Sequence, residues 1–291
     1  MKELPVSSSN TNSWVRVLLF VVPYVVIVGL FQLFGGFITG NELSSESANA
    51  TTEQHLITSL FGFLGTFLVV YVFVKWVDKI PLINIGFHLK NHLKDLLLGL
   101  IAGVAIMALG YFALDISNEF QFVKTDYKGG EFFLTILVFL LVSVSEEMLF
   151  RGYVLRNLMG SMNKFLALII SAILFALLHA ANPNLSLVGN INLFLAGILL
   201  GLPYIYTKNL MFPIAFHFSW NFFQSIFGFN VSGLDSYSML TFQISDKNIW
   251  NGGDFGFEGS ILAIFLQTVS IYFCFVYFKN LKGKENGILA N

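Results

Sequence analysis

The sequence V-S-V-S-E-E-M-L-F-R-G-Y-V at residues 142–154 places two adjacent carboxylates and an arginine in a run that otherwise has the composition of a membrane span. The eleven residues before it, E-F-F-L-T-I-L-V-F-L-L at 131–141, are almost entirely apolar. An ionised carboxylate within the hydrocarbon core costs several kcal/mol unless it is paired or hydrated. Because folding alone requires neither Glu146 nor Glu147 at that depth, the stretch indicates a polar site within the bilayer.

The composition of the whole chain is typical of a membrane protein. Of the 291 residues, 56% are hydrophobic and 11% are charged, whereas a soluble domain carries about 25% charged residues. The formal net charge is −1, which gives no indication of a nucleic-acid partner. Cys274 is the single cysteine, so an intramolecular disulfide is excluded and we interpret this residue as a small core side chain.

Eight runs are apolar enough to be membrane-spanning helices, which need about 20 mainly apolar residues each. They lie at residues 14–39, 56–77, 93–115, 132–155, 165–180, 193–207, 210–229 and 260–278, and the fifth and sixth are short. The first run is longer than the hydrophobic region of a signal peptide and follows a mostly polar segment, so we expect it to be retained as a span. The predicted fold is an all-α, polytopic transmembrane helical bundle of about eight spans.

Basic residues are distributed unevenly between the connections of these spans. With the N-terminus on the inner side, 13 of the 16 Lys and Arg residues lie on that side, and Lys124, Lys128 and Lys247 lie outside. Because Lys and Arg accumulate in cytoplasmic connections, the asymmetry predicts that both termini are cytoplasmic. The connection 41–54 carries three Glu and no basic residue, which agrees with an outer position.

Few of the polar side chains that lipid excludes remain inside the predicted spans. They belong to three different helices, the fourth, the fifth and the seventh. They are Glu146, Glu147, Arg151, His179, His217 and Asn221. Because each is costly in lipid by itself, the simplest explanation is that the three helices bring them together at one site.

Helix geometry suggests how these side chains are arranged. Residues four apart lie on one face of a helix, so Glu147 and Arg151 are expected to form an ion pair. Glu146 is rotated from Glu147 by about 100° and faces another direction, which leaves it available as a general base. His217 and Asn221 also share a face and are expected to present an imidazole and an amide to one cavity.

Each of these residues also has a purely structural interpretation. The Glu147–Arg151 pair alone could connect two helices, and an intramembrane His or Asn221 alone could be hydrogen-bonded to a neighbouring helix. Phe175 and His179 share a face, so the phenyl ring is expected to pack beside the imidazole. What favours a site over these interpretations is that a structural pair does not require five ionisable side chains on three helices.

The expected depths of the two histidines disagree. His179 lies about 15 residues, or roughly 22 Å, from Lys164 at the inner end of its helix. His217 lies about 9 residues, or roughly 13 Å, from Lys208. Upright helices that begin at the same level would therefore separate the two histidines by about 9 Å.

Three short motifs resemble those of a known family. E-E-M-L-F-R at residues 146–151 fits EExxxR, F-A-L-L-H at 175–179 fits FxxxH, and H-F-S-W-N at 217–221 fits HxxxN. In this order and spacing they resemble the motifs of the CPBP family of intramembrane proteases, also called the Abi family. That family includes CAAX prenyl endopeptidases and bacterial bacteriocin-processing or immunity proteins. N-L-F-L-A-G-I-L-L-G at 192–201 is similar to the Gly-containing helix that the family places between its last two motifs.

The resemblance implies hydrolysis of a peptide bond inside the membrane, in a peptide or membrane-protein substrate. By position, it implies that Glu146 is the base that activates water. It also implies that Glu147 and Arg151 hold and polarise the site.

For the remaining motif residues the resemblance implies two schemes. His179 and His217 are either metal ligands or oxyanion donors, and Asn221 supports the oxyanion. With zinc or another divalent metal bound, the ligands would be His179, His217 and Glu147, since two His and one Glu form a known catalytic zinc set. However, the HExxH signature of soluble zinc proteases is absent, and Glu146 with hydrogen-bond donors to the oxyanion is also chemically complete. Both schemes stay open.

The resemblance covers about residues 132–229 and divides the chain into three parts. Residues 1–131 are expected to hold the first three helices, residues 132–229 the catalytic helical core, and residues 230–291 an outer loop and the last span. The longest loop, 230–259, is rich in Gly, Ser, Asp and Asn.

Two other functions compete with the protease. A non-catalytic immunity or scaffold protein could have the same fold, and a proton-coupled transporter could use intramembrane Glu, Arg and His as a relay. A transporter predicts paired broken helices and a repeat between halves, and the sequence shows neither. The high Phe, Ile and Asn content is typical of AT-rich bacterial genomes, so the expected setting is a bacterial cell membrane. The expected roles there are CAAX-type processing, bacteriocin maturation or self-immunity.

Overall fold

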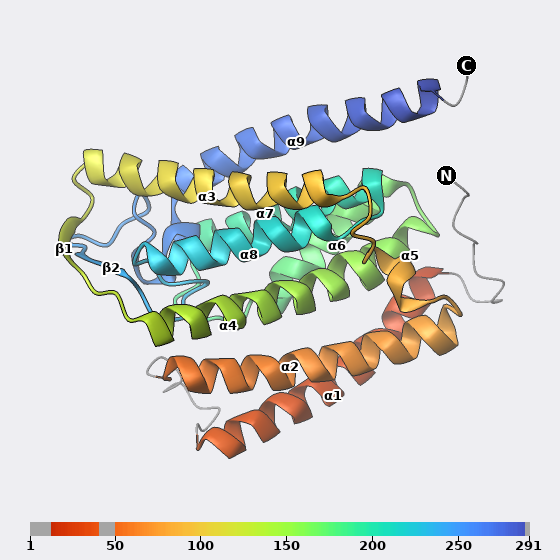
Figure 1. Ribbon diagram of the computed structural model, residues 1–291, viewed down its shortest axis with the longest axis horizontal. Coiled ribbons are helices and arrows are strands. Elements are labelled where there is room, and N and C mark those ends of the chain that lie inside the picture. The colour runs from red at the N-terminus through yellow and green to blue at the C-terminus, as the bar shows by residue number, and fades with distance from the viewer. Residues whose placement is uncertain (1–12, 41–49, 289–291) are drawn as a thin grey trace.

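Long apolar helices run side by side through the molecule (Figure 1). The structure, a computed structural model, describes residues 13–40 and 50–288, with side chains up to residue 281. Its helices are α1 (Ser13–Thr39), α2 (Thr52–Val72), α3 (Leu93–Ile116), α4 (Gly129–Glu147), α5 (Arg156–Met159), α6 (Lys164–Leu178), α7 (Leu187–Thr207), α8 (Met211–Ile226) and α9 (Ile261–Ile288). The predicted all-α bundle is therefore confirmed.

Among the described residues, six helical stretches are long and apolar enough to cross a membrane. They are Ser13–Thr39, Thr52–Val77, Leu93–Ile116, Gly129–Met159, Leu187–Thr207 and Ile261–Leu281. Two of them are composite. α2 continues into a short π-helix, η2 (Phe73–Val77), and α4 continues through another, η4 (Met148–Leu155), into α5. Because π-helical turns are frequent at functional sites, the one that follows the paired carboxylates is notable.

Two of the expected spans are shorter than a full crossing. α6 has 15 residues and α8 has 16. At 1.5 Å per residue each rises only about 23 Å, less than the roughly 30 Å of a hydrocarbon core. Eight described helices build the expected bundle, and six of them have the length of a span. α8 is mostly buried inside the bundle, whereas α6 keeps one exposed apolar face.

The sixth predicted span begins earlier than expected. α7 starts at Leu187 because the side chain of Ser186 accepts a hydrogen bond from the backbone N–H of Gly189 and caps the helix. Asn190 and Asn192 lower the hydropathy of the first two turns, so a count of apolar residues misses them.

α3 and α8 pack closely because two glycines of α3 face α8. A Cβ atom on Gly99 would lie 2.7 Å from the carbonyl oxygen of Phe212, and one on Gly103 would lie 2.7 Å from the Cβ of Ser219. Ser219 also donates a hydrogen bond to the carbonyl of Leu100 at 2.8 Å. Small residues four apart allow such close contact between membrane helices. This contact holds α8, which carries two of the candidate site residues, against α3.

One end of the bundle is covered by the segment 227–260, which we call the cap. Its strand β2 (Leu240–Gln243) pairs antiparallel with β1 (Gln121–Thr125), and two 3₁₀ turns, η5 (Gly253–Phe255) and η6 (Phe257–Gly259), follow. The sequence predicted only an outer loop here, without strands. In Figure 1 the cap lies at the end where α2, α4, α7 and α9 begin.

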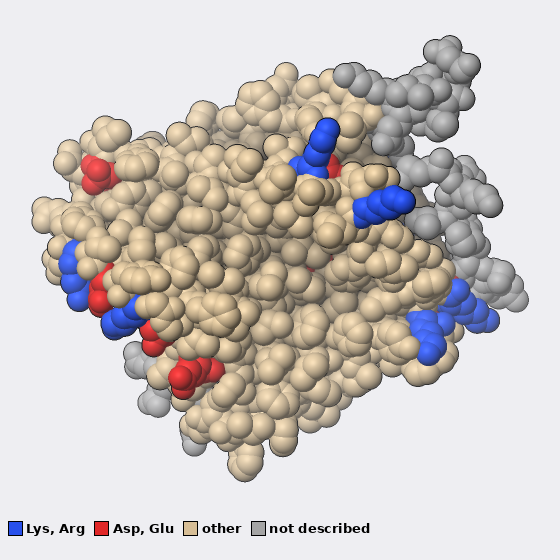
Figure 2. Space-filling view, viewed as in Figure 1, with Lys and Arg blue, Asp and Glu red and all other residues tan. Residues whose placement is uncertain are grey.

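The opposite end, which we call the basic end, is where α1 begins and α9 ends (Figure 1). There the carboxylate of Asp78 is fully buried and joins three elements. Its Oδ1 accepts from Nη1 of Arg16 at 3.0 Å, and its Oδ2 accepts from Nη1 of Arg156 at 2.7 Å and from Nδ2 of Asn157 at 3.2 Å. In Figure 2 the charged side chains of the visible face gather at the two ends of the bundle.

Candidate active site

The paired carboxylates lie at the last turn of α4, and the second of them is fully buried. Oε1 of Glu147 accepts a hydrogen bond from Nη1 of Arg151 at 2.9 Å, so the ion pair expected from the four-residue spacing is present. Arg151 also donates from Nη2 to the carbonyl of Gly197 on α7 at 3.1 Å, and its guanidinium carbon lies 4.8 Å from the ring centre of Phe175. The pair therefore joins α4 to α6 and α7. A buried charge needs such partners to be tolerated.

Glu147 also orients a histidine of α8. Nδ1 of His217 lies 2.8 Å from the same Oε1 of Glu147. An ionised carboxylate can only accept, so Nδ1 of His217 carries a proton. The other ring nitrogen, Nε2, consequently points away from Glu147 and towards Glu146.

His179 is held in a comparable way at the end of α6. It is the C-cap residue of that helix, and its Nδ1 donates to the backbone carbonyl of Phe175 at 2.8 Å. The ring centres of Phe175 and His179 are 4.7 Å apart, which confirms the expected packing of the two rings. Because a carbonyl oxygen only accepts, the neutral imidazole of His179 has its free acceptor at Nε2.

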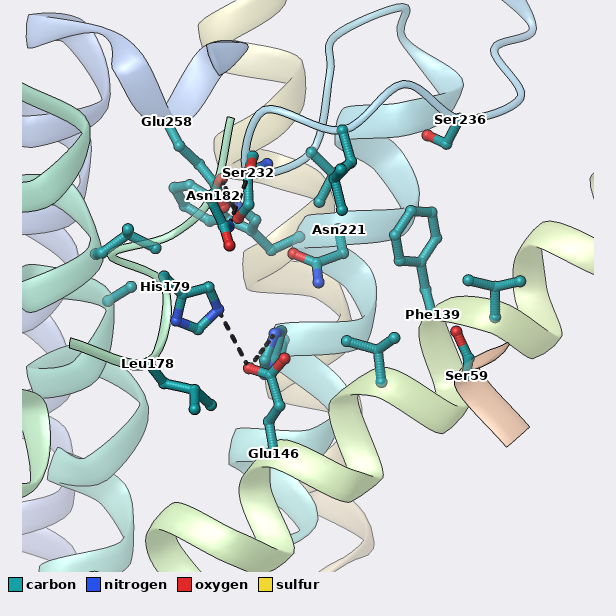
Figure 3. A pocket seen from close by; sticks show the side chains of 18 of the residues that line it. Ser59, Phe139, Glu146, Leu178, His179, Asn182, Asn221, Ser232, Ser236 and Glu258 are labelled. Atoms are coloured by element: carbon teal, nitrogen blue, oxygen red, sulfur yellow. Dashed lines mark hydrogen bonds and ion pairs between the residues drawn. The ribbon is translucent and has the colours of Figure 1, made fainter. Parts of the chain in front are cut away.

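Glu146 is the residue on which both imidazoles converge (Figure 3). Its Oε2 lies 3.7 Å from Nε2 of His179 and 3.9 Å from Nε2 of His217. These distances are too long for direct hydrogen bonds, and Oε2 is buried and has no hydrogen-bond partner among the described residues. Two polar atoms at such a separation suit one bridging water molecule about 2.8 Å from each.

The three side chains line a cavity of about 370 Å³ between α2, α4, α6, α7 and α8. Asn221, one turn beyond His217, lines the same cavity and points into it (Figure 3). The two residues thus share one face of α8, as the sequence suggested. Val138, Phe139 and Leu199 belong to the apolar part of the lining, which is suited to a hydrophobic peptide segment.

The cap contributes residues that the sequence did not identify. Glu258 lines the cavity, and its Oε1 accepts from Nε1 of Trp220 at 3.1 Å. Its Oε2 accepts from the backbone N–H of Ser232 at 2.9 Å and from the hydroxyl of Ser232 at 2.7 Å. Asn182 donates to the carbonyl of Ser232 at 3.1 Å and so ties the end of α6 to the cap. The available signal was an acidic residue next to a predicted span, which by itself is too common to select a site.

The structure also removes the expected difference in depth between the two histidines. His179 and His217 both reach the same oxygen of Glu146. The helices therefore do not stand upright from one level, which was the assumption behind the 9 Å estimate. α6 ends inside the bundle, and α8 is set by its contact with α3.

The ligand set expected for a bound metal is not assembled in this arrangement. Oε1 of Glu147 lies on the Nδ1 side of His217, whereas Nε2 of His217 and Nε2 of His179 face Glu146 instead. In the part of the chain that the structure describes, no group of three His, Cys, Asp or Glu side chains is arranged to hold a metal ion. The expected set of His179, His217 and Glu147 is therefore not brought together around one point, and we derive no catalytic step from a metal.

Comparison with known proteins agrees with the motifs. Residues 128–223 match the family described as type II CAAX prenyl endopeptidase Rce1-like. The match includes α4, α6, α7 and most of α8, and therefore all six candidate site residues, but it stops before the cap. No curated protein matches the chain. The chain is a multi-pass membrane protein, and about a third of it, residues 128–223, is similar to the Rce1-like type II CAAX prenyl endopeptidases, which agrees with the resemblance of its motifs to the CPBP or Abi family.

Proposed function

We propose that this protein is an intramembrane endopeptidase in which Glu146 activates a water molecule for attack on a peptide carbonyl. One observation carries the proposal. Oε2 of Glu146 has no hydrogen-bond partner among the described residues and lies between Nε2 of His179 and Nε2 of His217 in a cavity within the bundle. Such an acceptor, held beside two imidazoles, is suited to bind and deprotonate water.

The hydrogen bonds of His179 define its role in this scheme. Its Nδ1 proton is used by the carbonyl of Phe175, so Nε2 accepts. A water molecule that donates one hydrogen to Glu146 and the other to His179 keeps a lone pair directed at the substrate. Glu146 then takes the proton as the carbon–oxygen bond forms, and it returns that proton to the leaving amine when the carbon–nitrogen bond breaks.

α8 provides donors for the negative charge that develops on the carbonyl oxygen. The amide of Asn221 donates from Nδ2, and protonated His217 donates from Nε2 while Glu147 accepts from its Nδ1. The carboxylate of Glu147, which is shared with Arg151, and the neighbouring carboxylate of Glu146 both lie close to that imidazolium. His217 and Asn221 lie one helical turn apart, so a single oxyanion can contact both.

The proposed substrate is a membrane-associated or lipidated protein or peptide, and the proposed setting is a bacterial cell membrane. The family match supports CAAX-type processing. Bacteriocin maturation and self-immunity are related roles in which a peptide bond would be hydrolysed in the same way. A catalytically silent scaffold is the rival reading.

Cleavage of quenched fluorescent membrane peptides by the purified protein in detergent tests the proposal. Wild type, Glu146→Gln and His217→Ala are compared with Glu131→Gln, which changes a carboxylate in the first turn of the same helix outside the cavity lining. We expect cleavage by wild type and Glu131→Gln and its loss in the other two. Equal cleavage by wild type and Glu146→Gln would contradict Glu146 as the base, and no cleavage by either would favour the scaffold.

A further inference from the structure

The two ends of the bundle differ in charge. Described basic side chains at the basic end include Lys79, Lys90, Lys164 and Lys208. At the cap end Lys124, Lys128 and Lys247 lie among acidic residues and form ion pairs with Asp126 and Asp254. Figure 2 shows the same contrast, with mainly blue side chains at the right and both colours at the left. Because basic residues accumulate on the cytoplasmic side, the cap end is the extracytoplasmic end.

The cavity lies in the half of the bundle nearest the cap. In α2, in the composite helix that begins with α4 and in α6 the lining residues come mainly from the half nearer the cap, in α7 they lie around the middle of the helix, and the cap itself contributes Ser232, Asp235, Ser236 and Glu258. The lining stretches of these four helices are 52–59 of α2, 135–146 of α4, 175–179 of α6 and 193–200 of α7.

Towards the basic end the bundle is closed below Glu146. Phe150, Arg151, Tyr153 and Leu155, the residues that follow on η4, are at most 4% exposed. The guanidinium of Arg151 spans from α4 to the backbone of α7, so this layer is filled by side chains and by a fixed ion pair. A peptide arriving from the basic end would have to displace that layer.

We propose that the active site opens to the extracytoplasmic side of the membrane, so that its substrate is a peptide segment that reaches the cavity from that side. The proposal rests on the proposed function, and it specifies the substrate class further. It points to exported peptides or to the outer segments of membrane proteins, rather than to a cytoplasmic prenylated C-terminus.

The charges of the cavity support this substrate class. Among the described residues, its acidic lining side chains are Glu146, Asp235 and Glu258, and no Lys or Arg lines it. The oxygens of Glu258 accept from uncharged donors, Trp220 and Ser232, so its negative charge is not neutralised there. A free C-terminal carboxylate would be repelled by these groups, whereas an internal segment with neutral or basic side chains would not.

Labelling of single cysteines tests the sidedness independently of activity. In a Cys274→Ser background, Lys247→Cys places a thiol in the cap and Lys90→Cys places one at the basic end. Neither residue lines the cavity. With a membrane-impermeant maleimide on intact cells, we expect Lys247→Cys to react and Lys90→Cys to react only after permeabilisation. The reverse pattern would overturn the proposal.

Cleavage by oriented vesicles tests the same point through function. An impermeant quenched peptide is added to sealed right-side-out and inverted membrane vesicles that contain wild type or Glu146→Gln, and detergent is then added to both. We expect wild-type cleavage in right-side-out vesicles before detergent and in both after it. Cleavage confined to inverted vesicles would overturn the sidedness and leave the protease function standing.

Failure of the protease function has a different result. In that case detergent-solubilised wild type and Glu146→Gln would be equally inactive, while cysteine labelling would still decide which side the cavity faces. A further experiment tests the repulsion of a carboxylate. One peptide that is cleaved near its C-terminus is supplied in two forms, as a C-terminal amide and as a free acid. We expect the amide to be cleaved about tenfold faster. Equal rates would contradict repulsion of a carboxylate.

Discussion

Two buried clusters of charged side chains in this protein, one around Asp78 and one around Glu146 and Glu147, use their carboxylate oxygens differently. At the basic end, both oxygens of Asp78 are occupied, by Arg16 on one side and by Arg156 and Asn157 on the other. In the cavity, Oε1 of Glu147 is shared by Arg151 and His217, while Oε2 of Glu147 and Oε2 of the neighbouring Glu146 have no described hydrogen-bond partner.

The difference shows how a structural cluster and a reactive one can be distinguished. A buried polar group without a partner costs free energy, so a cluster that only connects helices is expected to use all its acceptors. The Asp78 cluster does so. The cluster at Glu146 retains an unused acceptor, and that acceptor faces a cavity. A hydrogen-bond acceptor that is unused and faces a cavity indicates that a molecule from outside the chain binds or reacts there.

The largest expected effect is on activity, at the unused acceptor. Glu146→Gln removes the base and keeps the size of the side chain, so we expect the cleavage rate to fall by about 10²–10⁴-fold. The thermal unfolding temperature in detergent, followed by tryptophan fluorescence, should stay close to that of wild type. A large drop in this temperature would mean that Glu146, like Asp78, stabilises the packing of the helices.

At the Asp78 cluster we expect a loss of stability without a loss of catalytic activity. Asp78→Asn removes the buried carboxylate that Arg16 and Arg156 both contact, so we expect a loss of about 3–5 kcal/mol in the free energy of unfolding. Thermal unfolding in detergent measures it. The rate per folded molecule should be unchanged, and a selective loss of activity without destabilisation would contradict the distinction.

Glu147→Gln should combine both effects, because Glu147 belongs to the helix contacts and also orients His217. The amide oxygen can still accept from Arg151 and His217 but no longer compensates their charge. We expect a loss of about 1.5–3 kcal/mol in stability together with reduced cleavage. Measuring unfolding and turnover on one preparation separates the two, and an unchanged turnover would assign Glu147 to structure alone.

A smaller effect is expected from Asn157→Ala. Asn157 donates one of the three hydrogen bonds to Asp78, and the two arginines remain after its removal. The expected loss in stability is about 1 kcal/mol, visible as a small shift in thermal unfolding. Activity should not change. A loss as large as that of Asp78→Asn would mean that the amide, and not the arginines, dominates the cluster.

The smallest expected effect is that of a chelator. Since the described residues do not form a metal site, cleavage by purified protein should be the same with and without a divalent-metal chelator. Inhibition that is reversed by added zinc would contradict this and return the histidines to the role of ligands. Glu131→Gln serves again as the matched variant with an intact cavity.

Much of the fold and part of the site could be predicted because the relevant signals are local. Apolar runs predicted all eight helices of the bundle, and the four-residue spacing predicted the Glu147–Arg151 pair. The packing of Phe175 on His179 followed from the same spacing. The division at residues 131 and 229 stays a prediction, as do the catalytic roles assigned by resemblance.

Other features could not be predicted because they depend on contacts between distant segments. Apolar counting did not show that α6 and α8 are too short to span, or that His179 and His217 meet at Glu146. The cap is rich in small polar residues without periodicity, so its pairing with β1 and the position of Glu258 over the cavity left no readable signal.

By itself, then, the sequence determined a membrane-embedded bundle with three polar motifs on separate helices, and it assigned the basic residues to one side. These properties follow from hydropathy and from the 3.6-residue repeat, which act within single helices. Only the tertiary structure decided that Glu146, and not Glu147, faces both imidazoles, and that residues of the cap line the cavity. Tilt, helix length and the seating of α8 on the glycines of α3 set those relations, because side chains on different helices meet only after the helices have packed.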